Sequence, residues 1–168
     1  MRKHLHREYE VYQRLPPAHE RLIKMIDYSE DGTLILEYIP SGNVREYIES
    51  HKAEITPPQR LQWCIDAAEA VELVHSHDII HCHIKPENFL LDPDLWLRLI
   101  DFSGSSIDGK PPHVLENTRF FLPRSRYDEL PCLNNQFVII KFNIGKWNSS
   151  VSLTLQPPNS ESILRPYM

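Results

Sequence analysis

Long apolar runs, paired cysteines and clusters of basic residues are missing from this sequence. No stretch reaches the roughly twenty apolar residues that a membrane-spanning helix needs, and the charged start MRKHLHREYE is unlike a signal peptide. The three cysteines, Cys64, Cys82 and Cys132, have no paired spacing, which fits a reducing compartment better than a disulfide framework. We therefore expect an intracellular protein, of the cytoplasm or nucleus, with no membrane partner.

Basic side chains are too dispersed to form a nucleic-acid surface. Lys and Arg number 18 against 23 Asp and Glu, and they are scattered from Arg2 to Arg165 without a run that could follow a phosphate backbone. We therefore expect no nucleic-acid partner, and nothing in the sequence indicates an oligomeric state. The sequence does contain 41% apolar residues in a length of 168, which is enough for the core of one domain.

Apolar periodicity predicts a chain of the α+β class. A Pro-Pro pair at 16–17 ends a first helical pattern, and the Asp-Gly pair at 31–32 is a tight-turn signal between two strand-like runs. Thr56 followed by Pro57 has the form of an N-cap and the first position of a helix. The predicted segments are a helix over 4–15, a hairpin of 21–29 and 33–39, a helix over 43–50, a long helix from 56, and a hairpin of 88–92 and 97–101.

The last third of the sequence carries weaker signals. After Asp101 the chain becomes polar and contains Gly and Pro, which is typical of a long mobile loop. From Cys132 onward, FVIIKFNIG predicts a lone strand with no evident partner, and NSSVSLTLQPPNSES is rich in Ser and Pro. We therefore predict one domain over 1–131 and a tail of uncertain order over 132–168.

Two motifs in the middle of the chain carry chemistry. The segment HCHIKPEN, residues 81–88, is followed by an apolar strand and then by DFSG, residues 101–104. This arrangement resembles the H-R-D-L-x-x-x-N and D-F-G signatures of the protein kinase family. With Glu8 on the first helix and LEYI at 36–39, the resemblance covers about residues 5–125. It implies a partial protein-kinase-like fold: an N-lobe remnant over 1–40 with a helix and a hairpin, a hinge, and part of a mainly α C-lobe over 41–131.

The resemblance also implies cofactors and site residues. Protein kinases use ATP and Mg²⁺ to phosphorylate protein hydroxyls, so a protein substrate or protein partner is expected here. Lys85 followed by Pro86 is a pattern common in the serine/threonine branch. The implied catalytic residues are His83, Lys85, Asn88 and Asp101, the implied metal ligands are Asn88 and Asp101, and the implied cofactor-binding residues are Glu8, Glu37, Ile39 and Leu90.

Several positions depart from the family's pattern. His83 stands where the family has the aspartate that accepts the substrate proton, Cys82 replaces an arginine, and Ser103 replaces the first glycine of D-F-G. Arg124 stands about where the family has the glutamate of A-P-E. Only seven residues precede Glu8, so the sequence contains no glycine-rich loop or strand lysine ahead of it.

These departures predict a serine/threonine kinase homologue that is inactive or strongly impaired. The alternative is a pseudokinase that binds a protein partner and transfers nothing. A weaker alternative is an atypical kinase of the KEOPS type, which should carry an aspartate at position 83, where this sequence has His83.

Three further expectations concern individual side chains. Glu8 has no lysine partner in this sequence, so we expect it on the solvated surface rather than in an ion pair. We expect His81 to be a buried structural histidine, because the family uses it to brace the loop. The segment HSHDIIHCH, residues 75–83, also raises the alternative of a zinc site, although its spacing matches none of the usual zinc patterns.

Overall fold

The computed structural model describes residues 2–110, 138–141 and 152–155. In chain order these residues form α1 (Arg2–Arg14), β1 (Met25–Tyr28), β2 (Leu34–Leu36), α2 (Val44–Ser50), α3 (Pro57–His75), β3 (Ile79–Ile80), the 3₁₀ turn η1 (Pro86–Asn88), β4 (Phe89–Leu91), β5 (Leu97–Leu99), the 3₁₀ turn η2 (Phe102–Gly104), β6 (Ser106–Ile107), β7 (Val138–Lys141) and β8 (Ser152–Leu155). The strands pair as small antiparallel sheets of two strands each. This mixture of helices and hairpins confirms the α+β prediction.

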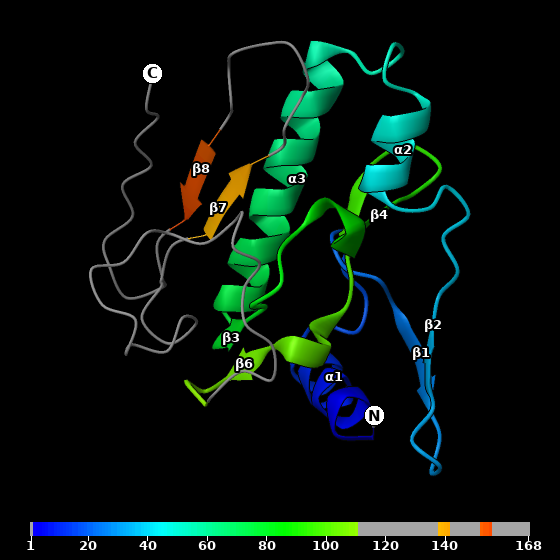
Figure 1. Ribbon diagram of the computed structural model, residues 1–168. Helices are drawn as coiled ribbons and strands as arrows, with labels where there is room; N and C mark the ends of the chain where they lie inside the picture. The colour runs from blue at the N-terminus through cyan, green and yellow to red at the C-terminus, as the bar shows by residue number, and fades with distance from the viewer. Residues whose placement is uncertain (1, 111–137, 142–151, 156–168) are drawn as a thin grey trace.

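Helix α3 runs through the middle of the molecule, between α2 and the β7–β8 hairpin (Figure 1). It begins where the sequence predicts, because the Thr56 side chain accepts a hydrogen bond from the Gln59 N–H and Pro57 fills the first helical position. Its buried apolar residues are Trp63, Cys64, Ala67, Ala70, Val71 and Val74. Burial of each large apolar side chain contributes roughly 1.5–3 kcal/mol, so this face anchors the core.

Helix α1 supplies a second buried face. Val11, Tyr12 and Leu15 are all buried, and Tyr12 and Leu15 belong to the helical spacing that predicted this helix over 4–15. The ring of Tyr12 meets the ring of Phe102 edge to face, with centroids 5.3 Å apart. Helix α1 therefore packs against η2, the turn that follows Asp101, although the two are distant in sequence.

The first predicted hairpin is present, but its strands are shorter than expected. Gly32 has a φ of +89°, a left-handed conformation that glycine adopts without strain, and β1 pairs with β2 around this turn. The start of the predicted run at 21–29 pairs elsewhere: Leu99 donates its N–H to the Arg21 carbonyl at 2.8 Å, and Ile23 donates to the Leu99 carbonyl at 3.2 Å. That half of the run therefore joins the hairpin to β5.

The second hairpin, β4–β5, is confirmed at the predicted place. Phe89 pairs with Leu99 and Leu91 with Leu97, and all four side chains are buried. The indole N–H of Trp63 donates to the Leu95 carbonyl at 2.8 Å, so α3 holds the hairpin turn. The short helix α2 is also confirmed, with the Asn43 side chain accepting a hydrogen bond from its Glu46 N–H.

The loop prediction after Asp101 is wrong for its first residues. Ser106 and Ile107 form β6, which pairs with β3 through Ile80 and Ile79. Ser105, Ser106 and Ile107 are buried, and the hydroxyls of both serines donate to backbone carbonyls. The polar sequence therefore did not predict this strand, because hydroxyls can be buried when they are hydrogen-bonded. The rest of the predicted loop, including Arg124, lies outside the described residues.

The prediction of a lone strand near the C-terminus is also wrong. Strand β7 pairs antiparallel with β8, from Val138 opposite Leu155 to Lys141 opposite Ser152. The hairpin lies alongside α3 (Figure 1). The predicted boundary at 131–132 lies outside the described residues.

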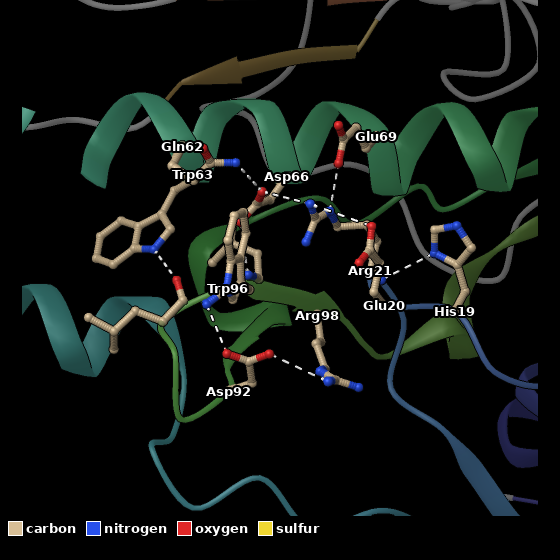
Figure 2. A network of polar contacts seen from close by, with 12 residues as sticks. His19, Glu20, Arg21, Gln62, Trp63, Asp66, Glu69, Asp92, Trp96 and Arg98 are labelled. Carbon is tan, nitrogen blue, oxygen red and sulfur yellow. Dashed lines mark hydrogen bonds and ion pairs between the residues drawn. The ribbon is translucent and has the colours of Figure 1, made fainter. Parts of the chain in front are cut away.

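A buried polar network joins three parts of the chain. Figure 2 shows Arg21 reaching Asp66 and Glu69 on α3, with nitrogen-to-oxygen distances of 3.3 Å and 2.6 Å. The guanidinium of Arg21 also lies 5.0 Å from the centroid of the Trp96 ring. Asp66 accepts the N–H of Leu97 at 3.1 Å, so the network fixes β5 against α3 and the connection before β1.

Within the described residues, none of the helices has the length and apolar character that crossing a membrane requires.

Candidate functional site

The loop at 81–88, between β3 and β4, is held by its first histidine. The Nε2 of His81 donates to the Ile100 carbonyl at 2.9 Å, and its Nδ1 accepts the N–H of His83 at 3.2 Å. Only 2% of His81 is exposed, and burial lowers the pKa of this imidazole to about 4. His81 is therefore a neutral, buried brace, as the sequence analysis expected.

Asn88 ties the end of the same loop to its middle. Its side-chain Nδ2 donates to the His83 carbonyl at 2.8 Å, and its backbone carbonyl accepts the N–H of Ile100 at 3.0 Å. The Asn88 N–H in turn donates to the Lys85 carbonyl at 2.9 Å. These bonds place Asn88 next to the residue that precedes Asp101, and they leave its amide oxygen as the side-chain atom available to a cation.

Asp101 leads from β5 into η2 in a left-handed backbone conformation, with a φ of +65°. The Ser103 hydroxyl donates to Oδ1 of its carboxylate at 2.7 Å. Nδ1 of His83 lies 3.8 Å from its other oxygen, Oδ2. Each carboxylate oxygen therefore has a polar neighbour from this chain. The sequence analysis treated Ser103 only as a departure from the family's pattern. The spacing of a hydroxyl side chain two residues after an aspartate was the local signal that could have predicted this hydrogen bond.

His83 and Lys85 lie close enough to interact through their charges. Partial burial lowers the pKa of His83, the positive charge of Lys85 lowers it further, and the carboxylate of Asp101 opposes both effects. At neutral pH the imidazole of His83 is therefore mostly uncharged. The structure brings His83, Asn88 and Asp101 together directly, and Lys85 joins them at the start of η1.

The expectation that Glu8 lies on the solvated surface is wrong. Only 7% of Glu8 is exposed, and its Oε1 accepts the N–H of Phe102 at 3.3 Å. Burial, and then the negative charge of Asp101, raise the pKa of Glu8 to about 7, while the hydrogen bond from Phe102 acts in the opposite direction. Glu8 is thus hydrogen-bonded to Phe102, the residue that directly follows the candidate metal ligand Asp101.

Three rings connect helix α1 with the loop. Tyr12 lies 5.3 Å from Phe102, and Phe102 lies 5.1 Å from the ring of His81, measured between centroids. The sequence predicted Tyr12 as part of the apolar face of the first helix but not its contact with Phe102, although Tyr12 stands one helical turn after Glu8. These edge-to-face and tilted ring contacts fix the position of the turn after Asp101 relative to α1.

The remaining cofactor candidates lie along the strands. Glu37 follows β2, and its Oε1 accepts the N–H of Lys24 at 2.8 Å and Nη1 of Arg98 at 3.2 Å. Arg98 pairs across β4–β5 with Leu90, which is half-buried against the core. Ile39 is likewise a half-buried side chain packed on the core. Arg98, which the sequence analysis missed, thus joins the Glu37 segment to the Leu90 hairpin.

The donors at this site suit a hard cation better than zinc. The Asp101 carboxylate and the Asn88 amide oxygen are the oxygen ligands that Mg²⁺ prefers. In the part of the chain that the structure describes, no group of three or more His, Cys, Asp and Glu side chains could hold a metal ion. The Sγ of Cys82 is engaged with the Ile80 carbonyl at 3.3 Å. The zinc alternative therefore has no support among the described residues.

The braced loop, the buried asparagine and the aspartate beyond a hairpin follow one another in the order of the protein kinase loop and D-F-G signatures. Comparison with known families agrees: the sequence model described as "Protein kinase domain" matches residues 1–123. The chain belongs to the protein kinase domain family. Its described helices and hairpins are part of a protein-kinase-like fold, as the sequence analysis expected.

The curated proteins similar to this chain include several plant receptor-like kinases. The chain is 31% identical over 120 residues to a receptor-like protein kinase of Arabidopsis thaliana, covering 61% of this chain and 34% of the relative. It is 34% identical over 103 residues to the LRR receptor-like serine/threonine-protein kinase EFR of Arabidopsis thaliana, covering 50% and 10%. It is 34% identical over 93 residues to Chitin elicitor receptor kinase 1 of Physcomitrium patens, covering 50% and 14%. The chain thus spans about a third or less of the length of these relatives.

Proposed function

We propose that this chain is a serine/threonine protein kinase homologue in which phosphoryl transfer is severely impaired. The observation that carries the proposal is the imidazole of His83, which stands where the family has its proton-accepting aspartate. The loop around it is intact, since His81 braces it and Asn88 bonds to the His83 carbonyl. The proposal therefore rests on the changed chemistry of one side chain in a loop that hydrogen bonds hold in place.

Electrostatics explain why His83 is a poor replacement. A carboxylate accepts a proton and also supplies negative charge beside Lys85, whereas a neutral imidazole supplies no negative charge. Burial, and then the charge of Lys85, lower the pKa of His83 against the opposing effect of Asp101, which makes it a weaker base still. General-base assistance contributes about 10²- to 10⁴-fold in rate, or roughly 3–5 kcal/mol of activation free energy, so its loss leaves a slow enzyme.

The other site residues support binding of a nucleotide. Asp101 and Asn88 would hold Mg²⁺, which in the family neutralises negative charge between the phosphates when it is bound. Lys85 would place a positive charge at the transferring phosphate. The half-buried side chains of Ile39 and Leu90 would contact the adenine, on the segments that the Glu37–Arg98 pair holds together. A protein hydroxyl is the proposed acceptor.

The test measures phosphate transfer from radiolabelled ATP to a protein substrate by purified 1–168. We expect a barely detectable rate for the wild type, about 10²- to 10⁴-fold more for His83→Asp, and none above background for Asp101→Ala. Equal rates for the wild type and His83→Asp, both abolished by Asp101→Ala, would refute the proposal. A thermal shift with Mg-ATP at about 100 times its dissociation constant should stabilise the chain by about 2.7 kcal/mol if the pocket binds.

A second candidate function is a pseudokinase that binds a protein partner and transfers nothing. The observation in its favour is a set of exposed apolar side chains on and after the first hairpin: Ile26 is 60% exposed, Ile35 43% and Tyr38 85%. Exposed apolar side chains of this kind can contribute to a protein contact surface. Binding of ATP without any transfer by His83→Asp would favour this function over the impaired enzyme.

A further inference from the structure

Two of the positions at which this chain departs from the kinase signatures lie beside the same carboxylate. Ser103 donates its hydroxyl to Oδ1 of Asp101 at 2.7 Å, and Nδ1 of His83 lies 3.8 Å from Oδ2. The family has a glycine and an aspartate at these positions, and neither offers a hydrogen-bond donor from its side chain. The two substitutions are far apart in sequence, but they converge on one metal-ligand candidate.

The Ser103 contact is a charge-assisted hydrogen bond of good geometry. A hydroxyl that donates to a carboxylate at this distance forms one of the stronger hydrogen bonds found in proteins. The backbone favours it, because Ser103 lies within η2, the 3₁₀ turn that begins immediately after Asp101. The hydroxyl occupies one of the lone-pair directions of Oδ1 and draws on the negative charge that a cation at this oxygen would need.

His83 affects the second oxygen without forming a short bond. The backbone of His83 is held in place on both sides, because its main-chain N–H donates to Nδ1 of His81 and its carbonyl accepts Nδ2 of Asn88. At 3.8 Å from Oδ2 the ring occupies space beside the carboxylate, and it carries no negative charge that would attract a divalent cation. An aspartate at this position would add negative charge instead.

We propose that Ser103 and His83 act as internal competitors for the Asp101 carboxylate, so that this pocket binds divalent cations weakly. The inference rests on the proposed function, in which Asp101 and Asn88 are the cation ligands. Nucleotide binding by this chain then gains little from Mg²⁺, in contrast to a pocket in which the same two oxygen donors have no internal partner.

The experiment titrates Mn²⁺ alone, without nucleotide, into purified 1–168 and follows free Mn²⁺ by electron paramagnetic resonance. Mn²⁺ prefers the same octahedral oxygen coordination as Mg²⁺. Ser103→Ala removes the hydroxyl and His83→Ala removes the ring, while the backbone bonds of both residues remain. We expect Ser103→Ala to bind Mn²⁺ about tenfold more tightly than the wild type, the equivalent of one hydrogen bond to a charged group. His83→Ala should also bind more tightly, and the double variant most tightly.

Two variants serve as controls. Ser29→Ala removes a matched hydroxyl, which donates to the Asp31 carboxylate two residues later in the β1–β2 turn, and it should leave the titration unchanged. Asp101→Asn defines the background from other carboxylates. Circular dichroism of each variant, and Ser103→Gly as a second hydroxyl deletion, guard against an effect of altered folding.

Three results would overturn the inference. The first is an unchanged Mn²⁺ affinity in both Ser103→Ala and Ser103→Gly, and the second is no binding above background in the double variant. The third is a weaker affinity in His83→Ala, because it would show that the ring is a ligand. The proposed function is tested by a different assay, because impaired transfer is measured with ATP and the His83→Asp variant. The two failures are therefore distinguishable.

Discussion

Arg21 and Asp66 form a buried ion pair between the connection that precedes β1 and helix α3. Nη2 of Arg21 lies 3.3 Å from Oδ1 of Asp66, and the Asp66 side chain has no exposed surface. The same carboxylate accepts Nε2 of Gln62 at 2.8 Å and the N–H of Leu97 at 3.1 Å. One buried charge thus joins three segments, and its desolvation is offset only while these partners are in place.

Replacing Asp66 should therefore destabilise the whole domain. Asp66→Ala leaves the buried guanidinium of Arg21 without this partner and the N–H of Leu97 without an acceptor, so we expect a loss of about 3–5 kcal/mol of unfolding free energy. Urea denaturation followed by circular dichroism measures it. Glu49→Ala is the matched control, because Glu49 pairs with Arg45 on an exposed face and its loss should leave the midpoint unchanged. Equal midpoints for the two variants would contradict the prediction.

Glu8 should make stability fall as pH rises. Its pKa is raised from 4.5 to about 7 in the folded chain, so between these values the folded state holds a proton that the unfolded state has released. The unfolding free energy of the wild type should fall over this range by about 3 kcal/mol relative to Glu8→Gln, and the difference should stay constant above pH 7. Urea titrations at pH 4.5, 5.5, 6.5 and 7.5 measure the difference.

The control for this pH dependence is Glu10→Gln, on the same helix but with a side chain that is 46% exposed. This variant should follow the wild-type curve. If Glu8→Gln also followed it, Glu8 would be titrating as an exposed carboxyl, and its burial against Phe102 would be in doubt.

His81 should remain neutral under mildly acidic conditions. Burial lowers its pKa to about 4, and its two ring nitrogens have fixed roles as donor to Ile100 and acceptor from His83. We expect nitrogen-15 NMR to show a neutral Nε2–H tautomer between pH 7 and pH 5, whereas free histidine in the same buffers becomes mostly protonated, with a pKa near 6.5. A His81 signal that titrates with free histidine would show that the brace is solvated.

Tyr12→Phe should stabilise the chain. The hydroxyl of Tyr12 is buried and has no hydrogen-bond partner among the described residues, while its ring packs on Phe102. Removing an unpaired buried hydroxyl and keeping the ring should raise the unfolding free energy by about 1 kcal/mol. Tyr12→Leu, which loses the aromatic contact, should lower it. A loss of stability in Tyr12→Phe would indicate that the hydroxyl has a partner.

Local signals predicted most of the described elements. The Thr56 cap with Pro57 located the start of α3, and the Asp31-Gly32 turn located the first hairpin, because each depends on neighbours within a few residues. The loop motif likewise indicated that His81 is buried. Signals that depend on distant partners failed: Glu8 is buried because Phe102, in a remote part of the sequence, donates to it.

The sequence by itself determined the family, the order of the helices and hairpins, and the identity of the loop residues, because these follow from capping, turn and motif patterns within short windows. Only the tertiary structure decided that Arg21 pairs with Asp66, that β3 pairs with β6, and that Ser103 and His83 lie beside Asp101. The physical reason is that burial and long-range hydrogen bonds depend on which segments lie side by side in space, and local sequence patterns do not predict these contacts.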